Sequence, residues 1–230
     1  MLRIAFGDVV RGGRVVVERG VIALPGGAVV GLVGLNGAGK TSWMHCIAGI
    51  VAEKAQLTID DRRVETVALM LQHPALPAWL TVREAVQLGL PPTVDVDGLL
   101  RAWGLTELSA KHTSALSTGQ LQFVAAMITA ESNATLRLFD EPFSALDIRR
   151  RRELVTRLQR GLPETEFAVV SAQASADLMD TCSHFLVLHE GRLRDIGSRA
   201  LLAGGADVQD RAAFESALLA HFAGPGTLHA

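Results

Sequence analysis

Gly34-Leu-Asn-Gly-Ala-Gly-Lys40-Thr41 is the stretch of this 230-residue sequence that decides its fold. It fits the pattern G-x-x-x-x-G-K-[ST], in which glycines let the backbone curl so that successive N–H groups point at phosphate oxygens. An apolar run over residues 28–33 precedes it as a buried strand, and residues 41–50 follow with helical apolar spacing. The alternative is a glycine-rich turn with an incidental lysine, but the chain has only three lysines. The stretch therefore predicts a phosphate-binding loop between a strand and a helix.

This loop also predicts which groups would hold a nucleotide. Lys40 would place a positive charge at the β- and γ-phosphates, and Thr41 would offer its hydroxyl to Mg²⁺. The N-terminal end of the following helix adds a partial positive charge. We expect ATP and Mg²⁺ as cofactors, with nucleotide contacts from Asn36, Gly37, Ala38, Gly39, Lys40, Thr41 and Ser42.

Strands and helices alternate along the rest of the sequence. Strands are expected over residues 14–18, 21–24, 28–33, 57–60, 67–71, 136–139, 166–171 and 185–188, and helices over 41–50, 84–89, 98–103, 121–129, 149–160 and 208–222. This alternation predicts an α/β fold with a mostly parallel sheet, the core of a P-loop NTPase. A helix-rich stretch over about 81–115 interrupts the alternation and predicts an inserted helical lobe. We expect one nucleotide-binding domain: a core over about 1–80 and 131–200, a lobe over about 81–130, and a C-terminal helix and tail over about 201–230.

Two carboxylates follow the expected strand 136–139. Asp140 and Glu141 would lie at the carboxyl end of that strand, where open α/β sheets bind their ligands. An aspartate there can hold Mg²⁺, and a neighbouring glutamate can polarise an attacking water. The alternative is an exposed strand end. Behind a phosphate loop, the pair instead predicts the metal-binding and catalytic half of the site.

Further motifs give the chain a family resemblance. Leu116-Ser-Thr-Gly-Gln120 lies upstream of Leu136-Arg-Leu-Phe-Asp-Glu-Pro-Phe-Ser-Ala-Leu-Asp147. With the phosphate loop, this order resembles the nucleotide-binding subunit of an ABC transporter over roughly residues 25–197. The resemblance implies a small antiparallel β-subdomain and a head-to-tail dimer. It also implies that Ser117, Gly119 and Gln120 contact the γ-phosphate of ATP held by the other subunit. Ser117 can act as an ordinary helix N-cap, worth about 1 kcal/mol, at the same time.

The resemblance assigns two more segments. Gln72 matches the Q-loop glutamine, which contacts Mg²⁺ or the attacking water and senses the transmembrane partner. Residues 144–147 match the D-loop, which crosses the dimer interface. Catalysis is therefore expected from Glu141, Gln72 and Gln173, and metal binding from Thr41, Gln72 and Asp140.

Several positions depart from the family. Gln173 stands where the family has a histidine that contacts the γ-phosphate, and an amide cannot carry the positive charge of imidazole. Thr118 replaces a glycine of the signature motif, and Phe123 replaces the arginine commonly found just after it. The aromatic residue expected near position 11, where the family stacks adenine, is absent, since the chain has no tyrosine and Arg11 is a poor replacement. Hydrolysis is accordingly expected to be slow, or this chain forms the weaker site of an asymmetric pair.

Composition limits the possible partners. The net charge of −2 gives no electrostatic case for nucleic acid, and no apolar run is long enough to span a membrane. Cys46 and Cys182 are read as buried thiols of a reducing cytosol. The segment 74–80 is apolar for a loop. Core packing and a socket for a helix of a membrane subunit explain it about equally well.

The expected function is that of an ATP-binding and ATP-hydrolysing subunit of an ABC transporter. Its partners would be a transmembrane permease subunit and a second cassette, identical or different, at the cytoplasmic face of the cell membrane. A soluble ABC ATPase acting on nucleic acid or ribosomes is the first alternative, although such relatives usually carry paired cassettes or long coiled-coil inserts. A weakly hydrolysing regulatory cassette is the second.

Overall fold

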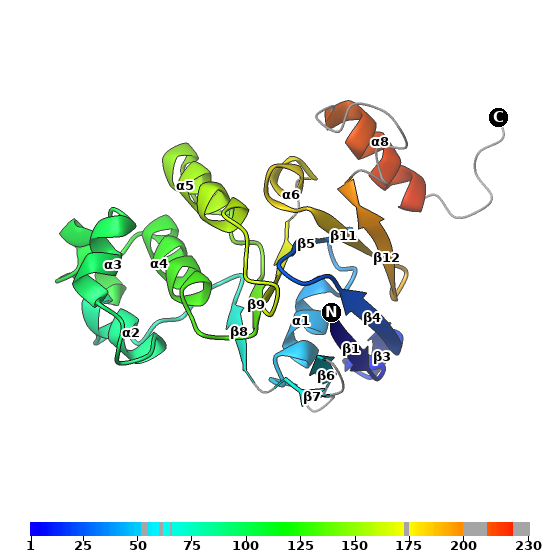
Figure 1. Cartoon of the computed structure of the whole chain (residues 1–230), viewed down its shortest axis with the longest axis horizontal. Coiled ribbons are helices and arrows are strands. Elements are labelled where there is room, and N and C mark those ends of the chain that lie inside the picture. The colour runs from blue at the N-terminus through cyan, green and yellow to red at the C-terminus, as the bar shows by residue number, and fades with distance from the viewer. Residues whose placement is uncertain (52–54, 60–61, 65, 173–174, 200–210, 223–230) are drawn as a thin grey trace.

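The fold is built around a central sheet, and one strand of this sheet leads into the phosphate loop (Figure 1). The computed structural model describes residues 1–51, 55–59, 62–64, 66–172, 175–199 and 211–222. In this part of the chain the sheet has six strands in the order β12-β11-β5-β10-β9-β8. Neighbours pair in parallel except β11 and β12, which are antiparallel. The strands are β5 (Val29–Val33), β8 (Val67–Met70), β9 (Leu136–Phe139), β10 (Phe167–Ser171), β11 (His184–His189) and β12 (Arg192–Ser198). The predicted α/β fold with a mostly parallel sheet is confirmed.

Both faces of this sheet are covered by apolar side chains. In β10, Ala168 and Val170 belong to one hydrophobic cluster, while Phe167 and Val169 belong to another. Every position of β9 and β10 is buried, and their sequences are accordingly apolar except for Arg137 and Ser171. The sheet is therefore an interior layer, and its strand ends are the places where it can present polar groups.

An antiparallel sheet lies beside α1 and accounts for the N-terminal part of the chain (Figure 1). It has the order β4-β1-β6-β7, and a separate hairpin is formed by β2 and β3. The bounds are β1 (Leu2–Phe6), β2 (Val9–Arg11), β3 (Arg14–Val17), β4 (Gly20–Leu24), β6 (Gln56–Ile59) and β7 (Arg62–Arg63). The small antiparallel subdomain implied by the family resemblance is thus present.

Helices between β8 and β9 form the lobe on the left of Figure 1. They are α2 (Val82–Gly89), α3 (Val96–Ala102), the 3-10 turns η1 (Thr106–Leu108) and η2 (Thr113–Ala115), and α4 (Thr118–Ala130). Capping boxes start two of them: Thr81 with Glu84 begins α2, and Ser117 with Gln120 begins α4. The fold therefore includes the predicted helical insertion.

The remaining helices are α1 (Lys40–Ile47), α5 (Ile148–Gln159), α6 (Ser175–Thr181) and α8 (Arg211–Phe222). Among the described residues, none of the helices is both long and apolar enough to cross a membrane. Cys46 and Cys182 are buried free thiols, as expected.

Some elements differ from those expected from the sequence. β12, where polar and apolar residues fail to alternate, and α6 were not predicted. α2, α3 and α4 begin two or three residues earlier than predicted, because their starts are set by the caps Thr81, Asp95 and Ser117 rather than by apolar spacing. Gln173 and residues 208–210 of the expected last helix lie outside the described residues.

Candidate active site

The phosphate loop connects β5 to α1 through residues whose backbone only glycine adopts easily. Gly37 has φ of 80° and Gly39, the N-cap of α1, has φ of 105°. A Cβ at Gly39 would also lie 3.0 Å from Val17 Cγ2 and 3.1 Å from the carbonyl oxygen of Val16. Both the conformation and the close packing against β3 therefore require glycine at position 39.

Lys40 is the cation of this loop. Its ammonium donates hydrogen bonds to the carbonyl oxygens of Gly34, at 2.7 Å, and Leu35, at 3.3 Å. The residue is 6% exposed, and this burial lowers the pKa of the ammonium, while the negative charges of Glu141 and Asp140 oppose the shift. Lys40 is thus held at the base of the loop with two carboxylates close enough to influence it.

A cavity of about 270 Å³ opens over the loop. Its lining joins the phosphate loop to two residues from distant parts of the sequence, namely Gln72 after β8 and Glu141 after β9. The loop residues that line it are Asn36, Gly37, Ala38, Gly39, Lys40, Thr41 and Ser42. The structure therefore brings the expected nucleotide-binding residues of the loop together with two of the three expected catalytic residues.

The two carboxylates after β9 are held by hydrogen bonds within the core. Ser171 Oγ donates to Asp140 Oδ1 at 2.7 Å and accepts from the backbone N–H of Glu141 at 2.9 Å. Gln72 Nε2 donates to Glu141 Oε2 at 2.9 Å. Glu141 has φ of 50°, a left-handed conformation uncommon for residues with a side chain. The cavity wall thus carries a fixed carboxylate beside an amide.

Asp140 fits the expected magnesium site. It is 1% exposed, and its Oδ2 is buried and accepts no hydrogen bond from the described residues. A buried anionic oxygen in that state is costly unless a cation or an ordered water satisfies it. No group of three or more His, Cys, Asp or Glu side chains in the described part of the chain could hold a metal alone. Since Mg²⁺ is usually bound by one or two carboxylates together with substrate phosphates, a single buried carboxylate close enough to act on Lys40 fits the protein's share of such a site.

The signature residues lie elsewhere. Ser117, Gly119 and Gln120 begin α4 and are absent from the lining of the loop cavity. Ser117 is exposed, and its hydroxyl accepts from the N–H of Gln120 at 3.3 Å, so it caps the helix as expected. A Cβ at Gly119 would lie 2.5 Å from the carbonyl oxygen of Ala145, which explains the glycine by packing within the chain. A single chain therefore does not unite the signature motif with its own phosphate loop.

A sequence model described as ABC transporter matches residues 21–144, more than half of the chain. The chain belongs to the ABC transporter family. The matched region contains the phosphate loop, Gln72, the signature motif and both carboxylates. It ends at Ser144, so Gln173 lies beyond it.

Curated family members are about a third identical to this chain where the two sequences align. The chain is 32% identical over 192 residues to the sulfate/thiosulfate import ATP-binding protein CysA of Mycobacterium tuberculosis, covering 76% of this chain and 55% of that protein. It is 30% identical over 192 residues to the molybdenum import ATP-binding protein ModC of Aromatoleum aromaticum, covering 74% of this chain and 51% of that protein. The chain thus spans about half the length of these curated relatives.

Solved structures support the same fold. The ATP-binding subunit of an ABC transporter superimposes with a TM-score of 0.75 at 22% identity, covering 94% of this chain and 98% of that one. A dimeric ATP-binding cassette in a post-hydrolysis state, bound to ADP and Pi, superimposes with a TM-score of 0.71 at 18% identity, covering 85% and 98%. These likenesses establish the cassette fold.

Three residues near the site were not among the site residues expected from the sequence. Ser171 and Gln122 are buried polar residues that hydrogen-bond around Glu141. Arg11, at the family's adenine-stacking position, donates from Nε to Ser42 Oγ at 3.2 Å and contacts His45 Nδ1 at 3.2 Å. The signal available for Ser171 was a polar residue ending an apolar strand. The partners of Gln122 and Arg11 lie 19 or more residues away, so no local pattern could show them.

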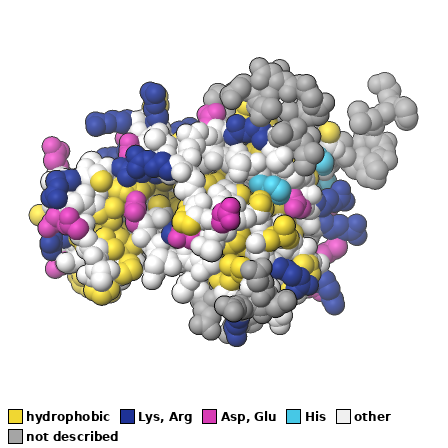
Figure 2. Space-filling view, in the orientation of Figure 1, with side chains coloured by type: hydrophobic (Ala, Val, Ile, Leu, Met, Phe, Trp, Pro, Cys, Tyr) yellow, Lys and Arg dark blue, Asp and Glu magenta, His cyan; other side chains and the backbone are white. Residues whose placement is uncertain are grey.

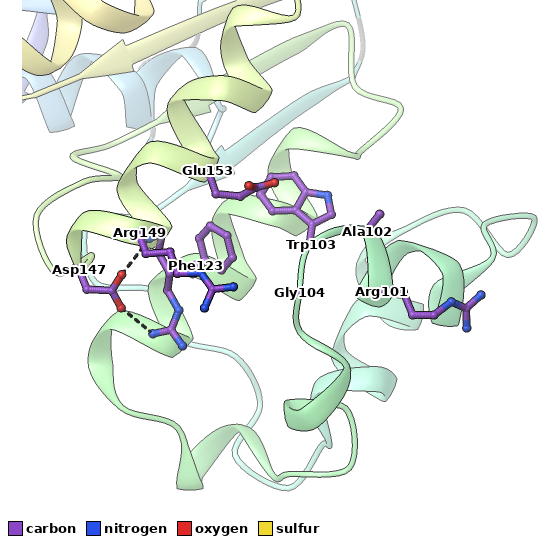
Figure 3. Close-up of a pocket in the computed structure, with 9 residues that line it drawn as sticks. Arg101, Ala102, Trp103, Gly104, Phe123, Asp147, Arg149 and Glu153 are labelled. Atoms are coloured by element: carbon purple, nitrogen blue, oxygen red, sulfur yellow. Dashed lines mark hydrogen bonds and ion pairs between the residues drawn. The ribbon is translucent and has the colours of Figure 1, made fainter.

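Phe123, one of the departures from the family, lines a second cavity, of about 370 Å³, between the lobe and α5. Figure 3 shows Trp103 and Phe123 close together there, with Glu153 beside the indole. The two rings meet edge to face with centroids 5.4 Å apart, and Phe123 is 2% exposed. In this chain, Phe123 therefore packs in the core at the position where arginine is expected from the family resemblance.

Proposed function

We propose that this chain binds Mg·ATP in the loop cavity and hydrolyses it. The observation that carries the proposal is that one cavity is lined by residues 36–42, by Gln72 and by Glu141. A cavity with phosphate-binding amides and a buried lysine on one side and a carboxylate on the other has the groups that phosphoryl transfer to water needs. The names of the relatives, which call them ATP-binding proteins, support the same activity.

Each group then has a distinct role. The loop amides and Lys40 would bind the β- and γ-phosphates, and Thr41 with Asp140 would hold Mg²⁺, which neutralises charge on the phosphate oxygens when bound. Glu141 would orient the attacking water, because its carboxylate lies on the cavity wall. Gln72, which donates to Glu141, would keep that carboxylate in place and would couple the site to the transmembrane partner.

We further propose that two cassettes complete each site. Ser117 is exposed at the N-terminus of α4, where the helix dipole and free amides favour an anion, but it is not part of the chain's own cavity. A two-fold head-to-tail pair would give each cavity the signature motif of the other chain. The dimeric cassette with ADP and Pi is a structural neighbour of this chain, which agrees with such a pair.

A membrane subunit is the proposed partner of the lobe. Trp79 is 75% exposed and Leu88 is 73% exposed, and Figure 2 shows apolar side chains at the edge of the lobe where α2 lies. Leu76, by contrast, packs against the core, so the apolar segment 74–80 contains both core packing and an exposed contact. An exposed tryptophan is a typical anchor of protein interfaces. We place the permease here, at the cytoplasmic face of the membrane, and infer uptake as the direction because the relatives are import proteins.

The proposed hydrolysis is slow, because Gln173 replaces the histidine of the family.

We also propose the division into a core over about 1–80 and 131–200, a lobe over about 81–130 and a tail over about 201–230. The lobe boundaries agree with the positions of α2 to α4.

The deciding experiment uses the full chain, alone and with the membrane protein that copurifies with it. Mg²⁺-dependent release of phosphate from ATP is measured for the parent and for Glu141→Gln, and size-exclusion chromatography with ATP reports association. We expect ATP to be bound by both proteins, hydrolysed by the parent and trapped in a lasting dimer by the variant, since glutamine keeps the shape without the carboxylate. A parent that binds no ATP would refute the function, and a variant that stays monomeric in ATP would refute the self-paired dimer.

A further inference from the structure

Gln122 is a buried amide that the proposed reaction does not yet use. It lies on α4, five residues after the cap Ser117, and is 1% exposed. Its Nε2 donates to the carbonyl oxygen of Glu141 at 2.9 Å and to Ser144 Oγ at 3.0 Å. Its Oε1 accepts from the backbone N–H of Ala145 at 2.9 Å. One side chain of the signature helix is therefore bonded to three points in the segment that follows β9.

The bond to Glu141 matters because the backbone of that residue is strained. A left-handed conformation at a residue with a side chain costs on the order of 1–3 kcal/mol and persists only where the surroundings impose it. Here the N–H of Glu141 donates to Ser171 and its carbonyl accepts from Gln122, so a buried side chain holds each side. These two bonds and the bond from Gln72 each restrain the direction of the Glu141 carboxylate.

The bond to Ala145 connects the same point to the signature motif. The first turn of α4 lies against Ala145 so closely that Gly119 has no room for a Cβ. Ser117 begins this turn, and Gln122 follows it in the next turn of the helix. The Glu141 segment is therefore connected to the turn that carries the exposed hydroxyl of Ser117 through Gln122, Ala145 and Gly119.

We propose that Gln122 is a positioning residue, which fixes Glu141 for attack in this chain's own cavity and ties that geometry to the signature helix presented to the second cassette. The proposal rests on the proposed function, because it assigns Gln122 a part in the same reaction. Gln122 touches no reacting atom. It acts through the main chain of Glu141, and its loss should reduce the chemical step rather than ATP binding.

The test replaces Gln122 by methionine, which keeps the length of the side chain and removes the amide. We expect kcat for Mg·ATP to fall about ten-fold or more, since a misplacement of about 1 Å can cost on the order of 100-fold, while Kd for ATP stays within about two-fold. Gln122→Asn, which keeps an amide one methylene shorter, should show the same kcat loss with a smaller effect on folding. Gln56→Met, at an exposed position of β6, is the control for the substitution itself.

A double-mutant cycle separates positioning from general stability. If Gln122 acts through the Glu141 carboxylate, adding Gln122→Met to Glu141→Gln should leave the residual rate of that variant unchanged. A further ten-fold loss in the double variant, or full kcat in both Gln122 variants, would overturn the proposal while leaving the ATPase function intact. A parent chain without Mg·ATP hydrolysis would overturn both.

Discussion

Replacing Lys40 by methionine measures what one buried charge contributes to the phosphate loop. Methionine keeps most of the apolar stem and removes the ammonium, which in the structure is bonded to the carbonyls of Gly34 and Leu35. In the nucleotide complex the ammonium would exchange these carbonyls for the β- and γ-phosphates. Two charge-assisted bonds of about 1.5 kcal/mol each would then be lost, so the affinity for Mg·ATP should fall by about 3 kcal/mol, or roughly 140-fold.

Isothermal titration with Mg·ATP measures this loss, and thermal unfolding shows whether the variant is folded. The melting temperature should change by no more than about 4 °C, equivalent to about 1 kcal/mol, because the carbonyl bonds lost are offset by no longer burying a charge. Lys111→Met, at an exposed position of the lobe, is the matched control and should bind ATP as the parent does. Unchanged affinity in Lys40→Met, or an equal loss in Lys111→Met, would show that the loop does not bind phosphate as described.

Three further substitutions test separate parts of the structure. Gly119→Ala places a Cβ 2.5 Å from the Ala145 carbonyl, so denaturant unfolding should show a loss of about 1–3 kcal/mol, and a parent-like stability would contradict the close packing. Gln173→His should raise steady-state ATPase activity about five-fold by adding about 1 kcal/mol of charge-assisted bonding, and a flat or lower rate would count against the H-loop assignment. Burial, followed by the Arg11 charge, lowers the pKa of His45 from 6.5 in the fold. Neutral His45 therefore contributes stability above about pH 6.5 that is lost as the pH falls through its lower folded value, and urea unfolding at pH 5.5 and 7.5 should show a smaller drop in His45→Gln than in the parent.

The parts of the site that sequence could predict are those with local rules. The phosphate loop needs glycines, a lysine and a flanking strand and helix within a few residues, and Asp140 and Glu141 directly follow a strand that is apolar except for Arg137. The helix starts could also have been predicted, because Thr81 with Glu84 is a local capping pattern. By contrast, Ser171 meets Glu141 across 30 residues of sequence, and the register of β9 against β10 brings them together. No periodicity encodes such a pairing.

The helical lobe contacts α5 at Trp103. With Phe123 in place of arginine on α4, the cation at this joint comes from α5, where the Arg157 guanidinium lies 4.8 Å from the centroid of the Trp103 ring. Arg157 also pairs with Glu153 at 2.9 Å and donates to the carbonyl of Ala102.

Two exposed groups that the proposed assembly uses lie on the same insertion as Trp103. Trp79 would meet the permease and Ser117 would meet the nucleotide of the second cassette, and both belong to the insertion between β8 and β9. Arg157 holds Trp103 by a cation–π contact and a hydrogen bond to the neighbouring carbonyl of Ala102, and the three bonds of Gln122 fix α4 to the segment after β9. The insertion is therefore held to the rest of the chain both at Trp103 and at Gln122, and Gln122 lies on the helix that Ser117 caps, so the bonds of Gln122 are the more direct restraint on the position of Ser117.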